Sequence, residues 1–168
     1  MRSALTTLCL LMLGLWLGAE IMFIQVAAVA FGALPPLFPN PADGVHGAGL
    51  VVNGTLTHLH YMGIALGLLF LFFTFLLWGS FRWHSLVPQA ALVLLMLVLT
   101  GYSQFSIIPR MDTAQASAGG SVAGLPESAP ARATFDALHR QSVHVELMVL
   151  IAGFAGFLLA GRPHTLRT

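Results

Sequence analysis

The chain is dominated by four long runs of apolar residues, separated by shorter segments that hold most of its prolines and charged residues. The runs cover residues 4–34, 50–78, 86–108 and 135–160. About 20 apolar residues, each rising about 1.5 Å along a helix, cross the ~30 Å hydrocarbon layer of a bilayer, and every run is long enough. The pattern predicts an all-α membrane protein: one domain over residues 1–168, folded as an up-down bundle of four transmembrane helices.

The segments between the runs differ in character. Residues 35–41 are rich in proline, which lacks the amide hydrogen that a helix needs, so we expect the first helix to end there. Pro109 is expected to close the third helix for the same reason. Residues 111–134 are rich in Ala, Gly, Ser and Pro, and this composition predicts a mobile loop.

Composition supports the membrane prediction and excludes several classes of function. Hydrophobic residues make up 57% of the chain and charged residues only 8%, whereas a soluble domain is about a quarter charged. The net charge of +1 comes with no basic patch, so nucleic acid is not an expected partner. The expected partner is the lipid bilayer, and a homo-oligomer is an open alternative.

The placement of arginine predicts the orientation in the membrane. The arginines expected on the side of both termini are Arg2, Arg82, Arg162 and Arg167, with no acidic residue among them. Those expected on the other side, Arg110, Arg132 and Arg140, lie beside acidic residues. Because cytoplasmic segments carry the excess of basic residues, we expect both termini in the cytoplasm, and a location in the bacterial inner (plasma) membrane.

Polar side chains inside the apolar runs fall on helical stripes. His139, Ser142 and Glu146 share one face of the fourth run, and Asn53 and His60 share one face of the second, so these faces are expected to meet inside the bundle. Ionisable groups at membrane depth are costly and are candidates for function. The predicted polar interior consists of Glu20, Asn53, Tyr102, Arg110, Ser142 and Glu146.

Histidines in the second and fourth runs offer an alternative, a haem or metal site. His58 with His144, or His60 with His139, come from helices that are diagonal in an up-down bundle, and paired imidazoles can ligate haem from opposite faces. The chain has no Cys-x-x-Cys-His motif, so such a haem would be bound non-covalently. The sequence does not identify a metal.

Three short motifs carry a family resemblance. They are Trp16-Leu17-Gly18 with Phe23, residues 104–111 (QFSIIPRM) and residues 135–142 (FDALHRQS). In these motifs the chain resembles the transmembrane-protein-205-like family, small four-helix membrane proteins whose domain has no known function. The signature positions that this resemblance implies are Trp16, Gly18, Pro109, Arg110, His139 and Ser142. Glu146 departs from the family pattern, in which asparagine is more usual.

Three functional interpretations follow. The first is a non-enzymatic structural or accessory membrane protein, in which polar residues bond helix to helix. The second is the non-covalent haem or metal site. The third is a subunit of a proton-coupled transporter that uses Glu20 and Glu146. Enzymatic catalysis of the soluble type is not expected, because the chain shows no nucleophile elbow, P-loop or dinucleotide fingerprint.

Overall fold

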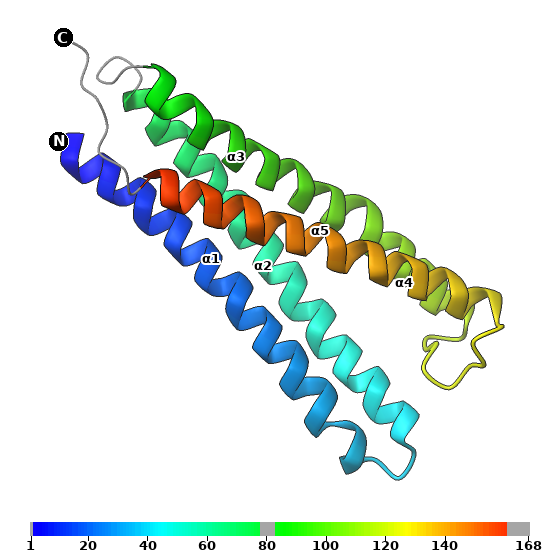
Figure 1. The fold of residues 1–168 in the computed structure, drawn as a ribbon. Helices are drawn as coiled ribbons and strands as arrows, with labels where there is room; N and C mark the ends of the chain where they lie inside the picture. The colour runs from blue at the N-terminus through cyan, green and yellow to red at the C-terminus, as the bar shows by residue number, and fades with distance from the viewer. Residues whose placement is uncertain (1, 78–82, 161–168) are drawn as a thin grey trace.

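The computed structural model describes residues 2–77 and 83–160, and the side chains of residues 4–77 and 86–160. The α-helices are α1 (Arg2–Ala33), α2 (Pro41–Leu77), α3 (Trp83–Tyr102), α4 (Ile108–Ser117) and α5 (Pro130–Ala160). A short 3-10 helix, η1 (Pro35–Leu37), follows α1, and a π-helical turn, η2 (Ser103–Ile107), lies between α3 and α4. No strand occurs in this part of the chain, so the all-α prediction is confirmed (Figure 1). The predicted end of the second helix at Trp78, and Arg82, Arg162 and Arg167, lie outside the described residues.

Four helical stretches are long and apolar enough to cross a membrane. They are Ala4–Leu37, Pro41–Leu77, Leu86–Ser117 and Pro130–Ala160. Large apolar side chains also cover the outside of the molecule, among them Leu11, Phe75, Val98 and Leu158. An apolar exterior of this extent is unfavourable in water and favourable in lipid.

The second helix starts at Pro41 rather than at residue 50. Proline is well tolerated in the first turn of a helix, where its missing amide hydrogen would have no partner in any case. The side chain of Asn40 accepts a hydrogen bond from the amide of Ala42 at 3.2 Å, which caps the new helix. Asp43 in the first turn adds a favourable interaction with the helix dipole.

The expectation that Pro109 closes the third helix is wrong. A π-helical turn, η2, interrupts the helix at Ser103–Ile107, and α4 then begins with Pro109 in its first turn. Proline is tolerated in the first turn of a helix because its missing amide hydrogen removes no hydrogen bond of that helix. The loop predicted for residues 111–134 is correspondingly shorter, because α4 extends to Ser117 and α5 starts at Pro130.

The connection between α4 and α5 is tied to α5 by one arginine. Nη1 of Arg132 donates hydrogen bonds to the carbonyl oxygens of Ala123 and Leu125, at 3.3 and 3.0 Å. Its Nε lies 3.6 Å from a carboxylate oxygen of Asp136, one turn further along the helix. The side chain of Val122 is buried. The segment therefore folds back on the helix that it precedes.

The long helices contact one another in a ring, α1 beside α2, α2 beside α3, α3 beside α5 and α5 beside α1. The start of α1 and the end of α5 lie at the same end of the molecule, and towards the other end α1 and α2 diverge from α4 and α5 (Figure 1). At the closed end, a buried core contains Trp16, Phe70, Met96 and Val149. The divergence positions the candidate site described below.

Trp16 is central to this core because α2 presents glycines to its ring. A Cβ atom added at Gly63 would lie 2.6 Å from Nε1 of Trp16, and one added at Gly67 would lie 2.9 Å from Cζ3. Such distances are far below van der Waals contact. Side chains at these two positions would displace the indole, so the glycines allow α1 and α2 to approach closely.

We predict that Gly63→Ala lowers the free energy of unfolding by about 1–3 kcal/mol, because the new methyl group overpacks against a ring that is buried on all sides. Gly54→Ala on the same helix is the matched control. A Cβ at Gly54 meets no atom within 4 Å, so the exchange should be neutral or stabilising by up to about 1 kcal/mol. Thermal unfolding of the detergent-purified variants measures both, and equal stabilities would contradict the packing of Trp16 on Gly63.

Candidate functional site

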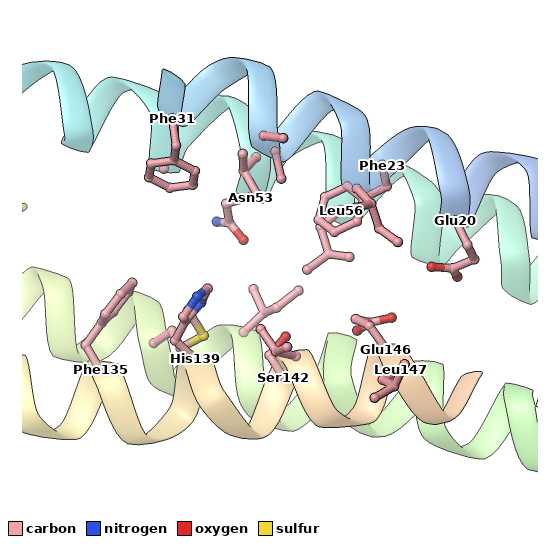
Figure 2. A pocket seen from close by; sticks show the side chains of 18 of the residues that line it. Glu20, Phe23, Phe31, Asn53, Leu56, Phe135, His139, Ser142, Glu146 and Leu147 are labelled. Carbon is pink, nitrogen blue, oxygen red and sulfur yellow. The ribbon is translucent and has the colours of Figure 1, made fainter. Parts of the chain in front are cut away.

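A crevice with a volume of about 720 Å³ lies between α1 and α2 on one side and α4 and α5 on the other. Most of its lining is apolar, with Phe23, Ile24 and Leu56 on the first side and Leu147 and Leu150 on the second. Figure 2 shows the two sides facing each other, with Glu20 opposite Glu146 at one end and aromatic residues at the other. A volume of this size is typical of sites for small molecules.

A cluster of hydrogen-bonded polar side chains connects α2, η2 and α5 at the centre of the molecule. His60 is 0% exposed, and its Nε2 lies 3.0 Å from Oε1 of Glu146. Its Nδ1 lies 2.9 Å from Oε1 of Gln104, and the hydroxyl of Ser103 donates to the same Glu146 oxygen at 2.8 Å. Both ring nitrogens thus face acceptor oxygens, and an imidazolium would donate both bonds.

The π-helical turn explains how two successive residues join this cluster. Ser103 and Gln104 are both buried, although neighbouring residues of a regular α-helix point about 100° apart. The wider turn of η2 brings both side chains towards the centre of the molecule. Such turns occur frequently at functional sites.

Glu20 belongs to the narrow end of the crevice. Its side chain is 3% exposed, and Nε1 of Trp16 donates a hydrogen bond to its Oε1 at 3.1 Å. The carboxylate points across the crevice towards that of Glu146 and is close enough to interact with it electrostatically (Figure 2). Two acidic side chains from different helices therefore share one end of a mostly apolar cavity.

The wide end of the crevice has a different character. Nδ2 of Asn53 donates to Oδ1 of Asp112 at 3.4 Å, which bridges α2 and α4. The imidazole of His139 stacks on the ring of Phe135, with 6.2 Å between ring centres. Phe31 lies across from Phe135 (Figure 2). This end therefore offers flat aromatic surfaces and a carboxylate that already has a partner.

The stripes on the second and fourth helices meet as predicted, at His60 and Glu146. Glu20 and Ser142 are buried in the interior, and Asn53 lines the crevice, which agrees with the predicted polar interior. Tyr102 and Arg110 were expected there as well, and this expectation is wrong. Tyr102 is 41% exposed and accepts a hydrogen bond from Gln141, whereas the exposed Arg110 lines a separate hollow against α5.

The geometry gives no support to the predicted haem pairs. His58 and His144 are exposed, and Nδ1 of His58 bonds to the carbonyl of Gly54 in its own helix. Both nitrogens of His60 have protein partners, whereas His139 lines the crevice against Phe135. In the described part of the chain no three or more His, Cys, Asp or Glu side chains are grouped to hold a metal ion.

Four residues of the site were not predicted from the sequence as site residues, namely Trp16, Ser103, Gln104 and Asp112. Trp16 and Gln104 lie in the motifs that carry the family resemblance, which was the available signal. Trp16 also precedes Glu20 by one helical turn, a spacing that allows the hydrogen bond observed. Asp112 had no such signal, because it falls in the segment that was expected to be a loop.

We predict that His60→Ala lowers the free energy of unfolding by about 2–5 kcal/mol, because Gln104 and Glu146 each lose a buried partner. His58→Ala, two residues earlier, is the matched control. Its ring is exposed and forms its hydrogen bond within its own helix, to the carbonyl of Gly54, so the cost should stay within about 0.5 kcal/mol. Thermal unfolding in detergent compares the two, and equal losses of stability would contradict the central role of His60.

Comparisons with protein-family models, with curated proteins and with solved structures found no match for this chain. The resemblance to the transmembrane-protein-205-like family therefore stays a prediction.

Proposed function

We propose that this chain is an integral membrane protein that binds a lipid-soluble molecule in the crevice between α1, α2, α4 and α5. Its four helices would form an up-down bundle, with both termini in the cytoplasm of a bacterial cell. Binding, rather than catalysis, is the activity proposed. It is the step that a carrier, a transporter subunit and an accessory protein have in common.

The observation that carries this proposal is the crevice of about 720 Å³ with its mixed lining. A purely structural role accounts for His60, Ser103 and Gln104, whose hydrogen bonds join helices. It does not account for a cavity beside them, because membrane helices are stabilised by close packing and a cavity forfeits contacts. Nor does it account for Glu20, whose carboxylate points into that cavity (Figure 2).

The crevice is accessible from the side of the molecule. Several residues that line it are also exposed on the outer surface, including Ile24 and Phe31 on α1 and Val143 and Leu147 on α5. These apolar residues would face the lipid in a membrane. A molecule dissolved in the bilayer could therefore enter between α1 and α5 without crossing water.

We predict that Val143→Trp weakens binding of the neutral fluorescent probe 1-pyrenemethanol by about tenfold or more, because the indole fills part of the crevice. Val98→Trp is the matched control, since Val98 is equally apolar and exposed but lies on α3 outside the crevice. Fluorescence titration of the protein in nanodiscs, with empty discs subtracted, gives both dissociation constants.

Equal effects of the two tryptophans would contradict the proposed site. A second copy of the chain is the competing occupant of the crevice. If Val143→Trp dissociated an oligomer of the purified protein and the wild type bound no probe, the crevice would be an interface between copies.

We predict that Ala118→Cys, in a Cys9→Ala background, reacts in intact cells with a thiol reagent that does not cross membranes. Thr165→Cys should react only after the cells are opened. The reason is the excess of arginine without acidic partners on the side of the termini. Labelling of Thr165→Cys from outside would contradict the proposed orientation.

A further inference from the structure

The two carboxylates at the narrow end of the crevice are only partly satisfied. Oε1 of Glu146 accepts hydrogen bonds from His60 and Ser103, but its Oε2 is buried and has no partner among the described residues. Glu20 accepts one hydrogen bond, from Trp16, and is otherwise directed at the crevice. A buried acceptor without a donor is costly, so the structure has a position here for a group that donates hydrogen bonds.

The charges at this position are unbalanced as well. His60 is the one basic side chain that contacts either carboxylate within the described ranges, and it contacts only Glu146. The chain has no lysine. Arg132 is paired with Asp136, and Arg110 lines a different hollow. Two carboxylates thus face at most one imidazolium, and a further positive charge between them would balance the cluster.

The rest of the crevice defines the remainder of the ligand. Beyond Glu20 and Glu146 most of the lining is apolar, although Asn53, Asp112, Gln115 and Ser142 also line it. At the far end the stacked Phe135 and His139 lie across from Phe31. A ligand that fits both ends has one cationic head and an apolar, preferably aromatic, body. Its entry from the lipid side agrees with this chemistry, because amphiphilic amines dissolve in bilayers.

We propose that the crevice binds an amphiphilic amine in its protonated form, with the ammonium group between Glu20 and Glu146 and the apolar body extending towards Phe31 and Phe135. The ammonium donates hydrogen bonds to both carboxylates, including the unpartnered Oε2 of Glu146. A quaternary ammonium has the charge but no N–H donor, so it binds less well. This inference rests on the proposed function and specifies its ligand.

The experiment uses four probes with the same aromatic body: 1-pyrenemethylamine, its N-trimethylated derivative, 1-pyrenemethanol and 1-pyrenecarboxylate. Each is titrated at neutral pH against the full chain in nanodiscs of uncharged phosphatidylcholine, with empty discs subtracted. The amine should bind at least about tenfold more tightly than the alcohol, the trimethylated amine should be weaker than the amine, and the carboxylate should be the weakest.

The variants Glu20→Gln and Glu146→Gln keep the shape of each side chain and remove its charge. Each should remove most of the advantage of the amine over the alcohol, measured as the ratio of the two dissociation constants. Asp136→Asn is the matched control, because it also removes one carboxylate, but Asp136 does not line the crevice and is paired with Arg132. Its amine affinity should change by less than about threefold.

Equal affinities of the wild type for the amine and the alcohol would overturn the inference and leave the crevice as a site for neutral molecules. An advantage of the amine that survives both Gln variants, or that Asp136→Asn abolishes, would also overturn it. If the trimethylated probe bound as tightly as the amine, hydrogen bonding by the ligand would be excluded. Failure of all four probes to bind would instead contradict the proposed function.

Discussion

The hydrogen bond between His60 and Glu146 is the interaction on which the rest of the structure depends. It joins α2 to α5, two helices that are not neighbours in the ring of helix contacts, and it lies where all long helices converge. Polar groups buried among apolar side chains are tolerated only when they are paired. The pair therefore fixes which faces of α2 and α5 point inward, and Ser103 and Gln104 complete its hydrogen bonding from η2.

This cluster also separates two parts of the molecule with different packing. On one side of the cluster the helices are tightly packed around Trp16, and the indole ring packs against Gly63 and Gly67. On the other side α1 and α2 diverge from α4 and α5, and the crevice opens (Figure 1). The polar residues lie at the boundary, so the narrow end of an apolar cavity is acidic. In a cavity of this kind the few polar groups fix the orientation of a ligand, and the apolar lining contacts its body.

Much of this arrangement could be predicted from the sequence, because helical periodicity is a local property. The repeat of about 3.6 residues placed His60 on one stripe and Glu146 on another, and these two polar faces were expected to meet inside the bundle. Gln104 could not be found in this way, because the π-helical turn changes the phase of the helix at that point. The extension of the helix past Pro109 was missed because proline was expected to end the helix, whereas here it lies in the first turn of α4. The crevice depends on how whole helices diverge, which no local pattern encodes.

Burial of one carboxylate has a structural explanation here, and burial of the second does not. Glu146 receives two hydrogen bonds that join three elements, so its removal from water is offset by the assembly of the core. Glu20 receives one hydrogen bond, from Trp16 of its own helix. This bond does not connect α1 to another helix. Such a bond contributes about 1.5–3 kcal/mol, whereas taking a carboxylate out of water costs several kcal/mol. Stability alone would thus favour an apolar residue at this position, and the proposed cationic ligand would supply the partner that the carboxylate of Glu20 lacks.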